Sequence, residues 1–120
     1  MPRRYASQDY CPVARTLDVL GDRWMILVIR DLLRGATRYT DLQASLRGIS
    51  PNLLSDRLKR LEAAGMVERV FYSDHPPRAE YRLTEKGRDF GAVVRAMYAW
   101  GSKHAPRRAG DFVPAHEPST

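Results

Sequence analysis

Apolar and polar residues between Ile49 and Val70 follow a pattern that predicts one helix and then one strand. Ser50 can cap the helix, and Pro51 supplies a helical φ at the first position, where its missing N–H costs nothing. Leucines recur at helical intervals and therefore share one face: Leu54, Leu58 and Leu61. Gly65 can end the helix, and the β-rich sequence after it predicts a strand.

Three shorter patterns before this helix also predict helices. Pro12–Leu20 carries one apolar stripe, and Trp24–Leu33 is apolar nearly all round, as in a helix packed on several sides. Asp22 is placed to cap the second of these helices. Thr40 and Gln43 have the spacing of a capping box, so we expect Thr40 to cap a third helix.

After the leucine-rich helix, the sequence predicts a hairpin and one more helix. Two strand-like segments, VERVFY and AEYRL, are separated by SDHPPR, whose two prolines exclude regular pairing and favour a stiff, exposed loop. Thr84 can then cap a last helix that runs from Glu85 to about His104. The apolar stripe of this last helix requires a packing partner.

These elements fit one domain in a chain of 120 residues. We place the domain at residues 11–104, between a flexible arm at 1–10 and a disordered tail at 105–120. The predicted order is four helices, then two strands, then a last helix. This order predicts a mainly α fold with a small β-hairpin, which is a winged helix-turn-helix. No apolar run is long enough for a membrane span, and the single cysteine cannot form an in-chain disulfide. We therefore expect a cytoplasmic protein without membrane association.

The charge of the chain favours a polyanionic partner. Lys and Arg number 20 against 14 Asp and Glu, which gives a net charge of +6. The major groove of DNA is about 12 Å wide and admits one α-helix. A helix-turn-helix with a hairpin exposes a helix that can enter this groove. We therefore expect the chain to bind double-stranded DNA. A winged-helix module that binds protein or RNA, without operator recognition, is the alternative.

The outer face of the leucine-rich helix carries the residues expected to contact DNA. Asn52 and Ser55 suit base edges, Lys59 can reach guanine or a phosphate, and Arg60 flanks the helix on the backbone side. Arg57 lies nearer the apolar face, so a phosphate contact and an internal ion pair are both open. The same residues would also suit an ordinary solvated helix.

Two further residues outside this helix are candidates for contacts to DNA. Arg78 lies beside two prolines at the expected hairpin tip, where it can enter a minor groove, clamp a phosphate or remain solvated. Thr40 opens the third helix, whose N-terminus suits a phosphate, although capping and packing explain it equally well. Enzymatic motifs are absent from the sequence, since it holds no P-loop, HExxH, GxGxxG or Cys-x-x-Cys, and its three histidines are scattered. We expect neither catalysis nor a metal or cofactor.

Several motifs together resemble one family. CPVARTLDVLGDRWMILVIRDLLRG, RYTDLQASLRGISPNLLSDRLKRLEAAGMVERVFY, PPRAEYRLTEKG and MYAWG, which cover about Cys11 to Gly101, are similar to the HxlR-type winged-helix transcriptional regulators of bacteria, relatives of the MarR group. The resemblance implies a homodimer built by the first and last helices. It also implies two recognition helices on successive turns of a near-palindromic operator, with repression as the commoner mode.

The residues themselves offer an apolar surface for such a dimer. It comprises Val13, Leu17, Phe90, Val94, Met97 and Trp100. Packing within one chain would use the same side chains. We therefore expect the apolar stripe of the last helix to pack within its own chain, against a second copy of the chain, or both.

Cys11 is a candidate for redox sensing. It lies just before Pro12 at a helix start, with Arg15 one turn on, and both the helix dipole and a cation favour thiolate. The resemblance implies a thiol switch, because some HxlR-type members use the matching cysteine in this way. Cysteine is also a common small core residue. An oxidant or a small-molecule effector is therefore a further expected partner, although no polar cluster identifies it.

Overall fold

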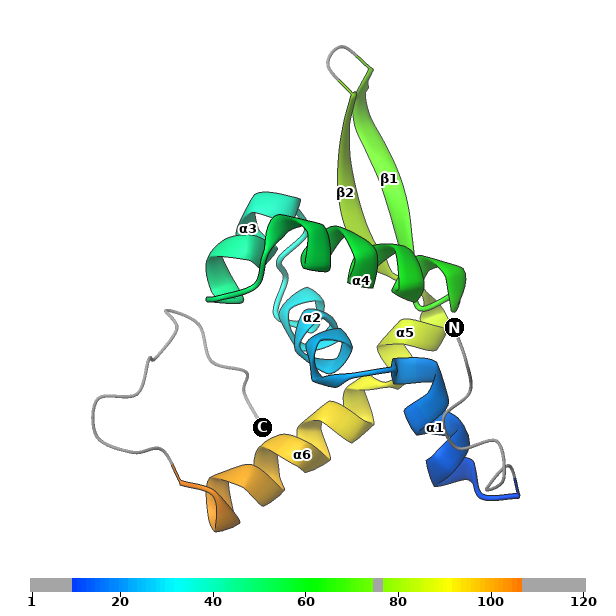
Figure 1. Cartoon of the computed structure of the whole chain (residues 1–120), viewed down its shortest axis with the longest axis vertical. Coiled ribbons are helices and arrows are strands. Elements are labelled where there is room, and N and C mark those ends of the chain that lie inside the picture. The colour runs from blue at the N-terminus through cyan, green and yellow to red at the C-terminus, as the bar shows by residue number, and fades with distance from the viewer. Residues whose placement is uncertain (1–9, 75–76, 107–120) are drawn as a thin grey trace.

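The computed structural model describes residues 10–74 and 77–106. The helices are α1 (Pro12–Leu20), α2 (Arg23–Leu33), α3 (Tyr39–Ser45), α4 (Pro51–Ala63), α5 (Glu85–Asp89) and α6 (Gly91–His104), and the strands are β1 (Val67–Asp74) and β2 (Pro77–Leu83). This order confirms the predicted mainly α winged helix-turn-helix with one β-hairpin (Figure 1). The expected arm and tail lie outside the described residues, apart from Tyr10, Ala105 and Pro106.

The core forms around α2, as the nearly all-round apolar pattern predicts. Val28 and Ile29 are completely buried, and the leucine face of α4 packs in the same cluster. The buried leucines of that face are Leu54, Leu58 and Leu61. Burial of a side chain of this size is worth about 1.5–3 kcal/mol, so these contacts hold α4 in a fixed orientation on α2.

Three predicted helix caps are present. The Asp22 carboxylate accepts hydrogen bonds from the backbone of α2, the Ser50 hydroxyl accepts one from Leu53, and the Thr84 hydroxyl accepts one from Gly87. The predicted stop at Gly65 is also confirmed, because this residue has a φ of 75°.

The predicted Thr40 cap is wrong. Arg38 is the N-cap residue of α3, its side chain makes no capping hydrogen bond, and Thr40 lies inside the helix. A tertiary contact explains the earlier start. The carbonyl of Thr37 accepts a hydrogen bond of 2.7 Å from the backbone of Tyr81, which holds the chain extended beside β2 until residue 38.

The hairpin extends further than the sequence predicts. Asp74 pairs with Pro77 and Ser73 with Arg78, so four residues of the expected loop belong to strands. Pro77 is tolerated because it is the first residue of β2, where a missing N–H does little harm. The pairing shifts between Phe71 and Ser73, which marks a β-bulge at Tyr72.

The predicted last helix is divided in two. The N–H of Phe90 bonds to the carbonyl of Gly87, three residues back, and this tight turn separates α5 from α6.

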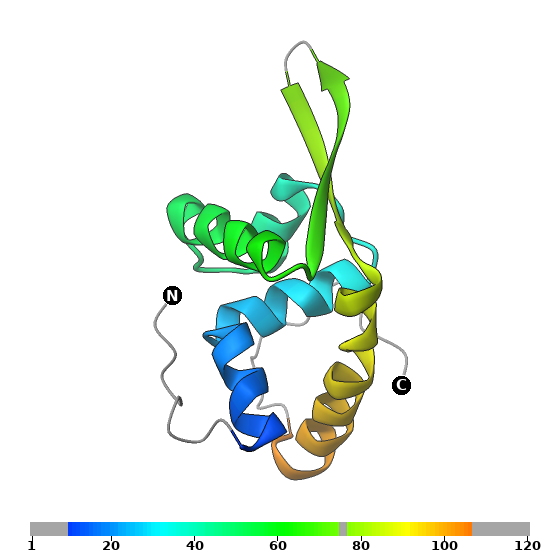
Figure 2. The same ribbon diagram turned by 90° about the vertical axis from the view of Figure 1, so that its right-hand side faces the viewer.

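The views in Figures 1 and 2 agree that α3, α4 and the hairpin lie on one side of α2 and that α1 and α6 extend on the other. Among the described residues, no helix has the length and apolar character needed to cross a bilayer.

Candidate nucleic-acid interface

The outer face of α4 is polar and exposed. Asn52, Ser55 and Lys59 are all exposed, on the side opposite the buried leucines. The start of α4 is tied to α3 by a hydrogen bond of 2.9 Å from the Tyr39 hydroxyl to the Pro51 carbonyl. Among the described residues, no acidic side chain forms an ion pair with Lys59, so its ammonium group is available to an external anion.

Arg57 forms the internal ion pair that the sequence left as one of two alternatives. Its side chain is only 15% exposed, and its Nη2 lies 2.7 Å from Oδ2 of Asp22, with a further ion pair to Asp56. Burial lowers the pKa of Arg57, but the hydrogen bond and charge of Asp22, followed by those of Asp56, outweigh burial and raise it. The other carboxylate oxygen of Asp22 caps α2. Asp22 therefore links the start of α2 to the middle of α4.

Arg60 is partly engaged on the surface of α4. Its Nε lies 2.9 Å from Oδ2 of Asp56, one helical turn earlier, while 41% of its side chain remains exposed. An exposed ion pair of this kind is worth little, about 0.3–0.5 kcal/mol, so a phosphate can replace the carboxylate at small cost.

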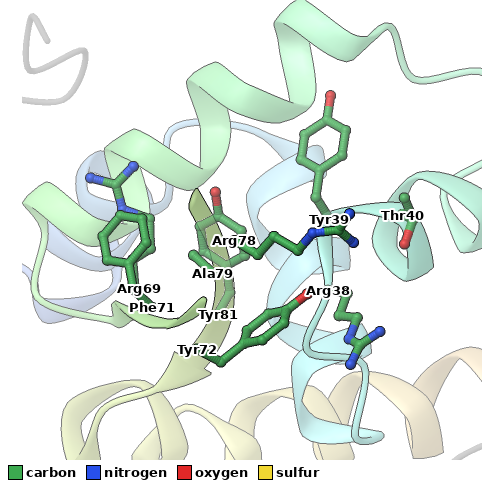
Figure 3. Close-up of a pocket in the computed structure, with 9 residues that line it drawn as sticks. All are labelled: Arg38, Tyr39, Thr40, Arg69, Phe71, Tyr72, Arg78, Ala79 and Tyr81. Atoms are coloured by element: carbon green, nitrogen blue, oxygen red, sulfur yellow. The ribbon is translucent and has the colours of Figure 1, made fainter. Parts of the chain in front are cut away.

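The hairpin and the start of α3 line an open hollow of about 390 Å³ (Figure 3). It brings together Arg78 and Thr40, two sequence-predicted residues from distant parts of the chain. The sequence did not single out the other cationic residues there, Arg38 and Arg69, nor the aromatic residues of the hairpin. Their proximity depends on the strand register and on the contact between Thr37 and Tyr81, and no local pattern encodes either.

Cys11 is the N-cap residue of α1 and is partly exposed. Backbone N–H groups of Ala14 and then Val13 lower the pKa of its thiol, burial opposes them, and the charge of Arg15 adds a smaller lowering. Helix α1, which Cys11 caps, lies on the side of α2 away from α4 (Figure 1).

The predicted dimer residues divide into two groups. Phe90 and Val94 pack partly against the core of their own chain. The others are exposed, with Trp100 at 64% and Met97 at 49%: Val13, Leu17, Met97 and Trp100. Val93 lies one helical turn before Met97 and adds a further exposed apolar side chain to this side of α6.

The model of the HxlR-like helix-turn-helix family matches residues 19–109, about three quarters of the chain. The chain belongs to the HxlR-like helix-turn-helix family. This confirms the resemblance found in the sequence. A curated relative from this group is Mb3122 of Mycobacterium bovis, an uncharacterized HTH-type transcriptional regulator, which is 42% identical over 98 residues. The match covers 82% of this chain but only 61% of Mb3122.

Solved structures of similar proteins share this fold. PA1607, a candidate transcription factor, superposes with a TM-score of 0.78 at 35% identity, over 97% of this chain and 84% of PA1607. The redox regulator HypR in its reduced form superposes with a TM-score of 0.74 at 35% identity, over 79% of this chain and 94% of HypR. The HxlR-like fold of the described residues is therefore that of known regulators.

Proposed function

We propose that this HxlR-like chain is a transcriptional regulator that binds double-stranded DNA as a homodimer on a near-palindromic operator. The observation that carries the proposal is the exposed polar face of α4, with Asn52, Ser55 and Lys59 opposite the leucines that anchor the helix. In this assignment Asn52 and Ser55 contact base edges, and Lys59 contacts a phosphate or guanine. Arg60 breaks its ion pair with Asp56 and pairs with a phosphate instead.

The hairpin and α3 complete the proposed contact surface. Arg78 is exposed on β2, and Thr40 is exposed near the start of α3. Both elements lie on the same side of α2 as α4 (Figure 1). In this proposal both residues contact the sugar-phosphate backbone beside the major groove. Arg57 has a different role, because its ion pairs with Asp22 and Asp56 occupy its guanidinium. It positions α4 rather than contacting DNA.

The exposed apolar surface of α1 and α6 supports the homodimer. Val13, Leu17, Met97 and Trp100 present large apolar side chains that a second copy of the chain would cover. A two-fold dimer places two copies of α4 about 34 Å apart, the spacing of successive turns of the major groove. Such a dimer would repress transcription by covering promoter DNA that RNA polymerase must reach.

A titration with two DNA fragments tests this function. One fragment comes from the region upstream of the protein's own gene, and the other has the same composition in scrambled order. We expect the dimer to bind the authentic fragment at least about a thousandfold more tightly, as specific DNA-binding proteins do. Fragments from neighbouring upstream regions are titrated in the same way. Operator recognition is contradicted if no upstream fragment binds more tightly than scrambled DNA.

Replacement of Lys59 by Gln should reduce the salt dependence of this binding. Each lysine–phosphate contact contributes about 0.9 to the slope of log K against log salt, so a dimer that loses two contacts should lose about 2 from the slope. The measurement is fluorescence anisotropy between 50 and 200 mM salt, roughly the range over which such slopes are resolved. Lys103→Gln, at the far end of α6, makes the same change of net charge and should leave the slope unchanged. An unaltered slope in Lys59→Gln contradicts the phosphate contact.

We also propose that Cys11 makes the regulator responsive to thiol-reactive compounds. HypR, at 35% identity, is a redox regulator with oxidized and reduced forms. This chain has a single cysteine. A two-electron oxidant would therefore either join the Cys11 sulfurs of two subunits or join Cys11 to an external thiol, and in both cases two thiols lose two electrons and two protons to the oxidant.

The pH dependence of alkylation tests the state of the Cys11 thiol. The pKa of this thiol is lowered in the folded chain, so its thiolate persists at lower pH than in an unfolded chain. We expect the iodoacetamide rate to reach half its plateau at a lower pH in the folded protein than in the same protein in urea. Coincident curves contradict the lowered pKa. A Cys11→Ser variant whose DNA binding still responds to oxidant contradicts the sensing role.

A further inference from the structure

The hollow between α3 and the hairpin has the size and walls of a small-molecule site. Its volume of about 390 Å³ lies within the range of about 300–1,000 Å³ typical of ligand pockets. Tyr39 contributes from α3, and Phe71, Tyr72 and Tyr81 contribute from the hairpin. In Figure 3 Tyr72 and Arg78 extend from the hairpin toward the start of α3, and Phe71 and Arg69 lie at the opposite end.

The β-bulge supplies one of these walls. Phe71 pairs with Ala79 and Ser73 with Arg78, which leaves Tyr72 without a cross-strand partner. In a regular strand, neighbouring side chains would point to opposite faces. Because the bulge adds one residue, Phe71 and Tyr72 both line the hollow. Both rings remain substantially exposed, at 54% and 45%.

Guanidinium groups lie over these rings. The guanidinium carbon of Arg38 is 5.1 Å from the centre of the Tyr72 ring, and that of Arg69 is 5.3 Å from the centre of the Phe71 ring. Arg69 has a long ion pair of 3.8 Å with Glu62. Among residues 10–74 and 77–106, no carboxylate forms an ion pair with Arg38 or Arg78. The hollow therefore combines exposed aromatic surface with positive charge that this part of the chain does not neutralise.

We propose that the hollow binds a planar aromatic carboxylate and that this ligand competes with DNA. The carboxylate would pair with Arg38 and Arg78, and the aromatic ring would cover the exposed faces of Phe71 and Tyr72. A DNA phosphate satisfies the guanidinium groups but leaves these rings uncovered, which favours an aromatic anion as the occupant. The competition rests on the proposed function, because it requires that Arg78 and Thr40 contact DNA.

Competition follows from the shared groups. A ligand carboxylate on Arg78 removes the positive charge assigned to a phosphate, because Arg78 lines the hollow and is also a proposed DNA contact. For two ligands that exclude one another, the apparent Kd for DNA rises by one plus the ratio of ligand concentration to ligand Kd. At ten times the ligand Kd, DNA binding should therefore weaken by about tenfold.

The first experiment measures binding of 1-naphthoate by calorimetry without DNA. Two matched compounds separate the contributions: 1-naphthalenemethanol keeps the rings and lacks the charge, and cyclohexanecarboxylate keeps the charge and lacks the aromatic ring. We expect each to bind at least about fivefold more weakly than 1-naphthoate, from the loss of a charge-assisted pair or of ring contacts. If either matched compound binds as tightly as 1-naphthoate, or 1-naphthoate does not bind, the proposal is overturned.

Variants locate the binding in this hollow. Tyr72→Leu keeps apolar volume but removes the ring beneath Arg38, and Arg38→Gln removes the charge; each should weaken 1-naphthoate binding by about tenfold. Arg82→Gln is the control, because Arg82 is exposed on β2 and does not line the hollow. All three positions are on the surface, and thermal melting checks that the variants fold. Equal affinity for 1-naphthoate in Tyr72→Leu, Arg38→Gln and Arg82→Gln places the binding elsewhere and overturns the proposal.

The second experiment repeats the operator titration with 1-naphthoate present. A tenfold loss of DNA affinity that disappears in Tyr72→Leu supports competition, and unaltered DNA affinity with 1-naphthoate bound overturns it. The two proposals fail separately. Loss of preference between authentic and scrambled DNA contradicts the operator function, while calorimetry without DNA still decides whether the hollow binds the aromatic acid.

Discussion

Replacement of Met97 by Glu should leave the chain folded but monomeric, and should weaken operator binding by about a hundredfold or more. Met97 lies in the middle of the exposed apolar surface of α6, between Val93 and Trp100. In the proposed dimer a carboxylate at this position would be desolvated without a partner, which costs several kcal/mol. A monomer then contacts the operator through one recognition helix instead of two linked ones. The linkage raises the affinity for DNA by about 10²- to 10⁴-fold.

Sedimentation equilibrium and anisotropy titration measure the two effects on the same preparations. Ala99→Glu is the matched control, because Ala99 is exposed on the opposite side of α6 from Met97 and the substitution adds the same charge. We expect this control to remain dimeric with unaltered operator affinity. A Met97→Glu protein that is still a dimer would show that the subunits meet through another surface. A monomer that keeps full operator affinity would contradict the need for a dimer.

Replacement of Gly87 by Ala should destabilise the fold by about 3 kcal/mol or more, one of the larger effects of a single added methyl group. Gly87 is buried in the first turn of α5. A Cβ there would overlap the carbonyl oxygen of Met66 and lie 2.9 Å from Cδ2 of Leu83. The Met66 oxygen is backbone and already accepts a hydrogen bond from Thr84, so it cannot move aside without disturbing the base of the hairpin.

Urea unfolding measures this change, and Gly91→Ala supplies the comparison within the same segment. A Cβ at Gly91 would approach only the ends of flexible side chains, Nη1 of Arg95 at 3.1 Å and Cδ2 of Leu33 at 3.4 Å. We expect Gly91→Ala to change the free energy of unfolding by less than about 1 kcal/mol. If both variants unfold like the original protein, the close contact between α5 and Met66 is not a constraint on the fold.

The leucine-rich helix shows how far local sequence reaches. Its cap at Ser50, its start at Pro51 and its stop at Gly65 depend on interactions within about four residues, and the structure confirms them. The buried leucine face follows from helical periodicity in the same way. This face also determines which residues point outward, so the candidate contacts Asn52 and Lys59 follow from sequence once the helix is known.

Arg57 and the hairpin mark where sequence reasoning ends. The partner of Arg57 is Asp22, which lies 35 positions earlier in the chain, so no local pattern could choose between an ion pair and a phosphate contact. The extra paired residues of the hairpin and the bulge at Tyr72 depend on strand register. The division of the last helix at Phe90 accompanies the close approach of Gly87 to Met66, which is likewise a tertiary contact.

The sequence by itself therefore determined where helices form, three of their caps, the apolar faces and the family, because hydrogen bonding and amphipathic periodicity act over a few residues. Only the tertiary structure decided that Thr40 does not cap α3, that Arg57 is bound internally, and that Arg38, Tyr72 and Arg78 surround one hollow. Each of these outcomes depends on side chains from distant segments, whose distances are set when α2, α3 and the hairpin pack together.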